Sequence, residues 1–191
     1  MHQKKQQVEG ATPSRGFLLP VTFLMIINYQ WIMNNNSKEI TVDNNKYILR
    51  DANKEDKEFI FKVLKDNMLH LYQKHWGYWN EKSFDENYHE EHMRIIEHKG
   101  VKIGYLDFKF KVDCGYVNNI QVVENFRNKG LGTAIMRLVE QETITRELNK
   151  IRLKTFKDSG AINLYKRIGY KQISEDDTSI IMEKEIINDN S

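Results

Sequence analysis

The sequence predicts an α/β fold in which a mixed, partly antiparallel central sheet of six to seven strands carries helices on both faces. Two observations support this prediction. From residue 40 to residue 184, strand-like segments alternate with segments that have the 3.6-residue period of a helix. Residues 122–134 also join an apolar strand end, a loop with glycines and the start of an amphipathic helix. With 191 residues, one domain with a buried core is expected.

The first half of this pattern predicts one strand, two helices and a second strand. Apolar and polar residues alternate over residues 40–49, which predicts a first strand. Residues 53–56, Asn-Lys-Glu-Asp, are a variant of the capping box that begins a helix. A second helix is expected over residues 84–97, ending at Lys99 and Gly100, and a strand over residues 101–110. The apolar stripe of the first helix consists of Phe59, Ile60, Val63, Leu64, Met68 and Leu71.

The second half predicts four strands and two helices. A turn at residues 113–115 leads into a strand over residues 116–123. The helix after the glycine loop has an inner face formed by Leu131, Ile135, Leu138 and Val139. A strand over residues 151–156, a short helix around Tyr165 and strands near residues 170–174 and 179–184 complete the order.

The glycine loop, residues 127–132, reads Arg-Asn-Lys-Gly-Leu-Gly and has the features of a phosphate site. A helix start presents free backbone N–H groups at the positive end of the helix dipole. Gly130 and Gly132 allow a tight turn and a close approach of the main chain to a ligand. Arg127 and Lys129 add positive charge. The alternative is an ordinary turn between a strand and a helix.

Two common phosphate motifs do not fit this loop. A dinucleotide fingerprint needs a third glycine where the chain has Ile135, and a Walker loop needs a lysine that the sequence Gly132-Thr133-Ala134 lacks. The remaining pattern is Arg-x-x-Gly-x-Gly after a strand. About 35 residues downstream, residues 161–170 have the form A-x-x-L-Y-x-x-x-G-Y, with Tyr165 on the apolar face of a short helix.

Together these motifs resemble the two hallmarks of the GNAT superfamily of N-acetyltransferases, and the resemblance extends over about residues 46–184. It implies the GNAT fold, acetyl-CoA as co-substrate, no metal, and direct transfer of the acetyl group to a primary amine in a ternary complex. It also implies that Tyr165 is the general acid for the departing thiolate, although a tyrosine of the core is the alternative. A main-chain N–H near Val122, within residues 120–123, would polarise the acetyl carbonyl.

The resemblance also implies which residues bind acetyl-CoA. Those at the pyrophosphate are Arg127, Asn128, Lys129, Gly130, Leu131, Gly132 and Thr133. Many members have an asparagine that holds the pantetheine arm where this chain has Asp158 or Ser159, so Asp158 is a weaker candidate. The general base is not defined, because Leu153 stands where other members have a glutamate. The open candidates are water held by Asn118, Asn119 or Tyr116, and a carboxylate of Glu81, Glu90 or Glu91.

The acceptor is a small-molecule or peptide amine of undetermined identity. Residues 71–81 contain two tryptophans, two tyrosines and a glutamate, which suit either an aromatic, mildly acidic cup for a cationic amine or an anchor for a helix pair. The spacing of His89 and His92 is a weak indication of a metal site, and a solvated helix face is the favoured interpretation. The rival functions are a catalytically silent acyl-CoA sensor and a nucleotide-binding regulatory module.

The composition limits which partners and which cellular compartment are expected. The chain has 29 basic and 27 acidic residues and a net charge of +2, which predicts no nucleic-acid partner. The single cysteine, Cys114, suits a reducing compartment, so a cytoplasmic enzyme is expected, and a homodimer is left open.

The N-terminus is expected to stand apart from the catalytic domain. Residues 17–27 are apolar, but eleven residues are too few to span a membrane, and no stable membrane insertion is expected. We interpret residues 1–32 as a non-catalytic leader upstream of a start at Met33, and residues 33–191 as the acetyltransferase domain. A peripheral membrane anchor is the alternative.

Overall fold

The computed structural model describes residues 37–186, and the predicted leader lies outside them. The strands are β1 (Ser37–Val42), β2 (Asn45–Asp51), β3 (Met93–His98), β4 (Val101–Phe110), β5 (Gly115–Val122), β6 (Lys150–Phe156), β7 (Lys171–Glu175) and β8 (Ser179–Glu185). The helices are α1 (Lys57–Trp76), α2 (Glu81–Asn87), α3 (Leu131–Thr145) and α4 (Ala161–Arg167). Short 3-10 turns are η1 (Lys54–Asp56), η2 (Glu90–His92) and η3 (Glu124–Phe126).

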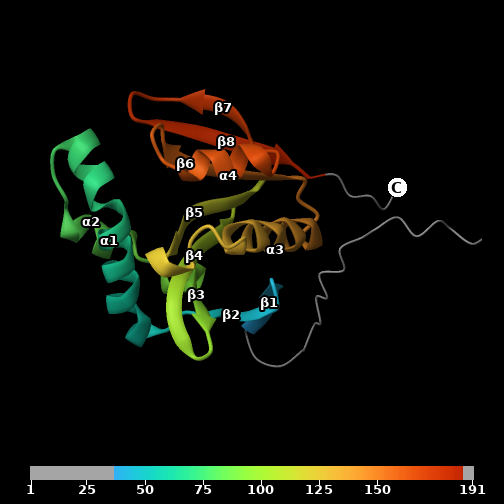
Figure 1. Ribbon diagram of the computed structural model, residues 1–191. Coiled ribbons are helices and arrows are strands. Elements are labelled where there is room, and N and C mark those ends of the chain that lie inside the picture. The colour runs from blue at the N-terminus through green and yellow to red at the C-terminus, as the bar shows by residue number, and fades with distance from the viewer. Residues whose placement is uncertain (1–36, 187–191) are drawn as a thin grey trace, which may run out of the picture.

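The strands form one sheet in the order β1-β2-β3-β4-β5-β6-β8-β7 (Figure 1). Within the described residues, β5 and β6 are the one parallel pair of neighbours, and the other pairs are antiparallel. The predicted α/β fold with a mixed, partly antiparallel sheet is therefore confirmed. The described sheet has eight strands, slightly more than the six to seven expected.

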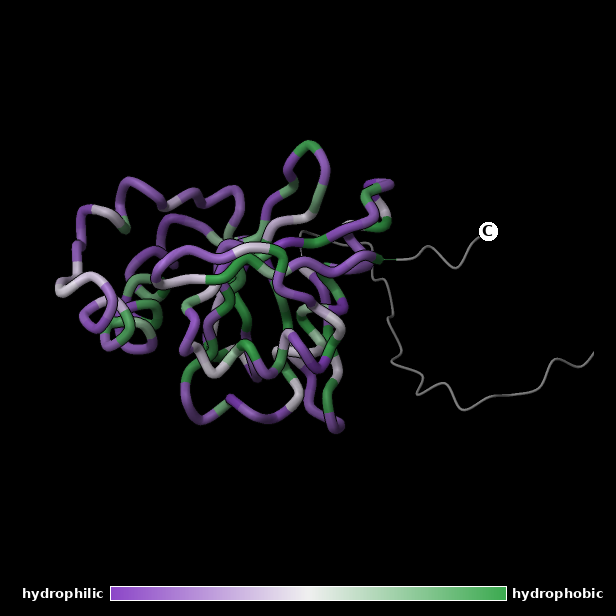
Figure 2. Tube along the Cα trace, turned by 90° about the horizontal axis from the view of Figure 1, so that it is seen from above, coloured by the Kyte–Doolittle hydropathy of each residue, from purple (hydrophilic) through white to green (hydrophobic). Residues whose placement is uncertain are grey.

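The sheet separates two hydrophobic clusters, one on each face. Ile95 of β3 and Tyr105 of β4 belong to a cluster with the apolar stripe of α1. Their neighbours in sequence, Ile96 and Leu106, belong to a larger cluster with α3 and α4. Since successive strand residues point to opposite faces, α1 covers one face and α3 and α4 cover the other. Figure 2 shows hydrophobic residues along the central segments and hydrophilic ones on the outer loops.

The single strand predicted over residues 40–49 is wrong, because a hairpin divides it. Asp43 and Asn44 have φ angles of 47° and 63°, and they connect β1 to β2. Positive φ at both central residues is the signature of a tight two-residue hairpin turn, and Asp and Asn tolerate it. The Asp-Asn pair between two apolar runs was the signal for this turn.

The helix predicted over residues 84–97 is also wrong beyond residue 87. Helix α2 ends at Asn87, and Met93–His98 form β3, which pairs with β2 and β4. Ile95 and Ile96 are fully buried on opposite faces of the sheet, a burial that one helix face could not give to adjacent residues. Lys99 and Gly100, with φ of 51° and 77°, form a hairpin turn and do not end a helix.

The turn η1, which runs directly into α1, begins with the predicted capping box. Asn53 and Asp56 form a capping box, in which the Asn53 side chain accepts from the N–H of Glu55 and the Asp56 side chain accepts from the N–H of Asn53. Ile60, Val63, Leu64 and Leu71 of the predicted stripe are buried against the sheet. The helix ends at Trp76 and is capped by Gly77, whose φ is 76° and whose N–H donates to the Gln73 carbonyl.

Candidate active site

The parallel strands β5 and β6 diverge, and this divergence exposes the backbone edge of β5. They are paired only where Gly115, Tyr116 and Val117 face residues 151–153. Beyond Val117, β5 has a neighbour on one side only, among the described strands. The pairing of β4 with β5 also shifts by one residue here, because Asp107 faces Asn119 while Phe108 faces Val117. This β-bulge at Asn118 marks the point where β5 leaves β6.

Val122 places its backbone polar groups on the unpaired edge. The N–H of Val123 donates to the Ile103 carbonyl of β4 at 2.8 Å. Because successive strand residues direct their N–H groups to opposite sides, the N–H of Val122 is directed away from β4. The Val122 carbonyl accepts from the side chains of Arg127 (3.0 Å) and Asn67 (3.2 Å). The predicted polarising N–H is therefore next to Arg127, which also donates to Asn67.

The predicted phosphate loop connects η3 to α3 and has an unusual backbone. Asn128 and Gly130 have φ angles of 59° and 78°, so the chain turns twice in the left-handed region. Gly130 is the N-cap of α3, and its carbonyl accepts from the N–H of Ala134 at 3.1 Å. The N–H groups of the first helical turn have no carbonyl partner within the helix, so they can bind an anion. The side chain of Leu131 is buried in the core, which leaves its main chain for such a role.

Gly132 brings the start of α3 against α4. A Cβ at this position would lie 3.0 Å from Cδ2 of Leu164, which precedes Tyr165. The glycine is therefore also needed for close packing of two helices, a reason that the sequence did not reveal. The contact places the phosphate loop next to the helix that carries Tyr165.

Tyr165 is 5% exposed and packs in the larger hydrophobic cluster. Its ring centroid is 5.9 Å from that of Tyr170. Burial raises the pKa of Tyr165 to about 12. The phenol is therefore protonated at neutral pH, as a proton donor must be before it acts. The same burial also fits the alternative, a tyrosine of the core.

Asp158 contacts helix α1. Its carboxylate accepts from Lys74 at 2.5 Å and lies 2.8 Å from Nε2 of His75. The hydrogen bonds from Lys74 and His75 lower the pKa of Asp158 to about 2. His75 in turn stacks on Phe156 at the end of β6, with ring centroids 4.8 Å apart. Both oxygens of this candidate ligand are thus already held by protein side chains.

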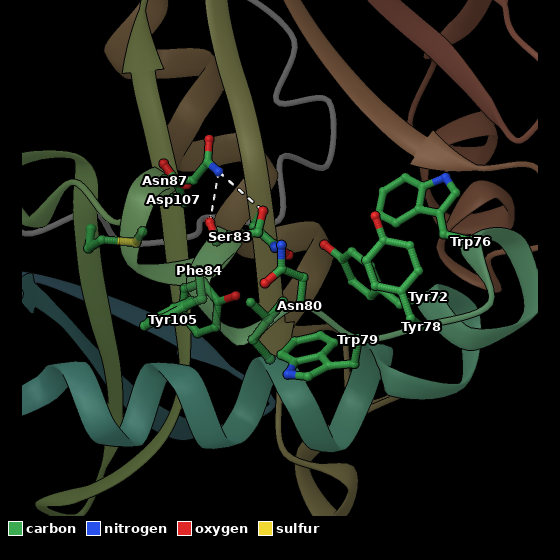
Figure 3. Close-up of a pocket in the computed structure, with 13 residues that line it drawn as sticks. Tyr72, Trp76, Tyr78, Trp79, Asn80, Ser83, Phe84, Asn87, Tyr105 and Asp107 are labelled. Carbon is green, nitrogen blue, oxygen red and sulfur yellow. Dashed lines mark hydrogen bonds between the residues drawn. The ribbon is translucent and has the colours of Figure 1, made fainter.

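A cavity of about 250 Å³ lies between α1, α2 and the sheet (Figure 3). The predicted acceptor segment contributes five of its lining residues, namely Tyr72, Trp76, Tyr78, Trp79 and Asn80. The others are Leu64, Ser83, Phe84, Asn87, Met93, Tyr105, Asp107 and Asn119. Trp76 and Tyr78 are 49% and 64% exposed, so they form its rim. Glu81, the predicted acidic group of the segment, pairs with Lys65 and is not among the lining residues.

Asp107 was not predicted as a site residue, and it is the one carboxylate among the lining residues of the described chain. It is 8% exposed and accepts from Nδ2 of Asn118 at 3.0 Å. Burial raises the pKa of Asp107 and outweighs the hydrogen bond from Asn118. The signal in the sequence was a lone acid inside the apolar strand of residues 101–110, two residues after Tyr105 and hence on the same face.

The residues that the sequence analysis names as candidates for the general base lie in different parts of the structure. Asn119 lines the cavity and accepts from Gln121 at 2.7 Å. The ring of Tyr116 lies beneath Nζ of Lys111, 3.4 Å from the ring centroid. Glu90 and Glu91 belong to the turn η2, where Glu91 lies 3.5 Å from His89. Of these four residues, Asn119 alone borders the cavity.

Residues 37–186 contain neither a cluster of metal ligands nor a membrane-spanning helix. In this range no group of three or more His, Cys, Asp or Glu side chains is arranged to hold a metal ion. No helix of the same range has both the length and the apolar character needed to cross a membrane.

Comparison with known proteins gives the family. A sequence model described as the acetyltransferase (GNAT) family matches residues 49–170, well over half of the chain. The chain belongs to the GNAT family of acetyltransferases. The resemblance seen in the sequence is thereby confirmed, and the matched range includes β5, the phosphate loop, α3 and Tyr165.

Individual proteins show how far the likeness extends. An uncharacterized N-acetyltransferase of Chlorobaculum tepidum is 31% identical over 90 residues, which cover 45% of this chain and 56% of that protein. The PaiA N-acetyltransferase of Thermoplasma acidophilum, solved with coenzyme A, has a TM-score of 0.60 at 17% identity, covering 73% and 98% of the two chains. The ribosomal-protein-S18-alanine N-acetyltransferase of Escherichia coli has a TM-score of 0.55 at 21% identity, covering 76% and 98%. At these identities the solved structures show that the fold is shared.

Proposed function

We propose that this protein transfers the acetyl group of acetyl-CoA to a primary amine by direct attack in a ternary complex. One observation carries the proposal: the phosphate loop at the start of α3 lies between the unpaired edge of β5 and the helix of Tyr165. Membership of the GNAT family supports this assignment. A buried Cys114 without a disulfide partner and the need for acetyl-CoA favour a cytoplasmic location.

The residues present fit acetyl-CoA as co-substrate. The free N–H groups at the start of α3 and the side chains of Arg127 and Lys129 would bind the pyrophosphate. The backbone edge of β5 would pair with the pantetheine arm as a strand does. Asp158 belongs to the proposed site as an acceptor for a pantetheine amide, once it exchanges one of its two partners on α1.

The proposed reaction is an addition to the thioester carbonyl followed by loss of the thiolate. The nitrogen of a neutral amine attacks the thioester carbon, the C–N bond forms, and the N–H of Val122 stabilises the oxyanion. The C–S bond then breaks, and the sulfur takes a proton from the Tyr165 hydroxyl, which is replaced from water. The attacking nitrogen loses one of its two protons to a base, so the products are an acetamide and free coenzyme A thiol.

Binding and turnover test the proposal separately with the full chain. Acetyl-CoA at about 100 times its Kd should stabilise the fold by about 2.7 kcal/mol. At this chain length that raises Tm by several degrees, and ATP should not. Amine-dependent release of thiol, followed with a thiol reagent, tests turnover. A rise in Tm without turnover for any amine class would indicate an acyl-CoA sensor, and a rise with ATP alone would indicate a nucleotide-binding module.

A further inference from the structure

We propose that the cavity between α1, α2 and the sheet binds a small primary amine with one apolar or aromatic substituent, and that Asp107 accepts the proton of this amine through water. This inference rests on the proposed function, because it names the acceptor and the base of the same reaction. It is carried by the lining of the cavity, its size and the position of its one carboxylate.

The lining favours an apolar substituent. Tyr72 is the centre of a group of rings, with centroids 4.8 Å from Trp76 and 5.0 Å from Trp79, both in edge contact. Such packed aromatic side chains form a fixed wall that binds apolar groups and cations alike. The exposed rings of Trp76 and Tyr78 continue this wall to the surface. Exposed aromatic side chains at the rim of a cavity are typical of a binding site.

The size and charge of the cavity suit a small, singly charged acceptor. Its volume of about 250 Å³ lies near the lower end of the range of ligand pockets. A polyamine carries several charges, but the described lining offers a single carboxylate, Asp107. The side of the cavity with Asp107 therefore suits the amine of the acceptor, and the side with Tyr72 and Trp76 suits its apolar group (Figure 3).

Asp107 has the contacts expected of a proton acceptor. Asn118 donates to Oδ1, and among the described residues no group donates to Oδ2. Asn118 is the extra residue of the β-bulge in β5, so the bulge directs its amide to Asp107. Asn118 is therefore a positioning residue for the Asp107 carboxylate.

The distance to the acetyl group requires water between Asp107 and the amine. Asp107 faces Asn119 across the ladder, and Val122 lies three residues farther along β5. Three residues of a strand span about 10 Å, which is beyond the reach of one hydrogen bond. Asn119 also lines the cavity and can hold such water. The proton leaves the amine nitrogen as the C–N bond forms, passes along the water chain, and leaves Asp107 neutral.

The groups around Asp107 determine its response to pH. Burial raises its pKa, and Asn118, Lys109, His92 and His89 oppose this shift. The phenols of Tyr105 and Tyr72 face the same region and are neutral because burial raises their pKa values. Because Asp107 must be ionised to accept a proton, activity should fall as the pH drops through its raised pKa.

The test compares acceptors and variants of the full chain with acetyl-CoA. 2-Phenylethylamine should be acetylated with a kcat/KM at least tenfold above that of spermidine or kanamycin. Asp107→Asn should lower kcat about 10²- to 10⁴-fold, leave the KM for acetyl-CoA unchanged, and abolish the acidic limb of the pH profile. Asp85→Asn, an exposed acid of α2, is the matched control and should retain full activity. Tyr78→Ala, at the rim, should raise the KM for 2-phenylethylamine about tenfold without affecting folding.

The outcomes separate this inference from the proposed function. If acetyl transfer occurs but spermidine is preferred, or Asp107→Asn keeps the wild-type kcat and pH profile, the inference is overturned and the proposed function stands. If no amine of any class is acetylated, the proposed function itself fails. Equal Tm values for the wild type and Asp107→Asn would show that a loss of kcat is not a loss of folding.

Discussion

Arg127 connects the phosphate loop to the reactive end of β5. Its guanidinium donates to the Val122 carbonyl and to Asn67, so one side chain fixes the strand edge and adds charge beside the free amides of α3. Both contacts lie at the position where the pyrophosphate and the pantetheine arm are proposed to meet. This arrangement makes Arg127 the most direct test of acetyl-CoA binding.

Arg127→Glu should weaken acetyl-CoA binding at least tenfold. A charge-assisted hydrogen bond contributes about 1.5–3 kcal/mol, and reversal of the charge adds repulsion toward the phosphates. Isothermal titration calorimetry measures the change. Arg137→Glu reverses a charge on an exposed position of α3 and should leave the affinity unchanged. Equal affinities for the wild type and Arg127→Glu would show that the pyrophosphate binds elsewhere.

Tyr165→Phe should lower kcat about 10²- to 10⁴-fold and retain acetyl-CoA affinity, because the ring and its packing remain. Single-turnover rates and Tm values measure the two effects. Tyr170→Phe is the matched control: this ring neighbours Tyr165, and its buried hydroxyl has no hydrogen-bond partner among the described residues. A full rate for Tyr165→Phe would assign Tyr165 to the core alone.

At the scale of elements, the pairing of β4 with β5 depends on Gly104. A Cβ at this position would lie 2.3 Å from the Gln121 carbonyl oxygen and 3.1 Å from the Val122 Cα. Both are backbone atoms of β5, which cannot move without disturbing the ladder. Gly104 therefore sets the position of the strand that carries the polarising N–H.

Gly104→Ala should reduce the free energy of unfolding by about 1–3 kcal/mol, the usual cost of an overpacked site. Urea unfolding followed by circular dichroism measures it. Gly160→Ala is the control, since a Cβ there meets no atom within 4 Å and φ is −58°. Wild-type stability for Gly104→Ala would mean that β5 can shift, and acetyl-CoA binding should then be measured on that variant.

A helix or strand could be predicted where the pattern that identifies it lies within its own segment. Helix α1 and strand β4 were predicted within a few residues, because a stripe or an apolar run belongs to the segment itself. The sequence favours a helix over residues 84–97 because Ile95 and Ile96 fit a helical face as well as a strand. Pairing with β2 and β4 on both sides decided the strand, and those partners lie elsewhere in the sequence.

At the scale of the whole molecule, buried ion pairs connect elements that are distant in sequence. Asp56 of η1 is fully buried and is bound by Arg50 of β2 (2.7 Å) and Lys102 of β4 (2.5 Å). Glu142 of α3 is bound by Arg94 of β3 (2.6 Å) and Lys38 of β1 (2.5 Å). Each group links one helical element to two strands.

These carboxylates predict a loss of stability in acid. Burial alone would raise the pKa of Asp56, but the hydrogen bonds from Arg50 and Lys102 prevail and hold it well below its ordinary value. Since the pKa is lower in the folded state, the stabilisation is fully present above the unfolded pKa, about 4. It is lost progressively as the pH falls from there through the lower pKa of the folded state.

Asp56→Ala should cost about 3–5 kcal/mol at pH 7, because it leaves buried positive charge without its partner. Urea unfolding at pH 7 and pH 3 checks this, and the difference from the wild type should shrink at pH 3. Asp66→Ala removes an exposed pair on α1 and should cost less than about 1 kcal/mol. A difference for Asp56→Ala that does not change with pH would contradict the linkage.

Residue types at fixed short spacing were enough to predict the family, the order of most elements, the phosphate loop and the candidate Tyr165. Three features became visible in the folded chain alone: Gly132 packs against Leu164, Asp158 is held by α1, and Asp107 lies in an aromatic cavity. They could not be predicted because burial and pairing arise between segments that are distant in the sequence. An aspartate in an apolar strand is ordinary in sequence, and its raised pKa exists only once α1 covers the sheet and the bulge of β5 turns Asn118 toward it.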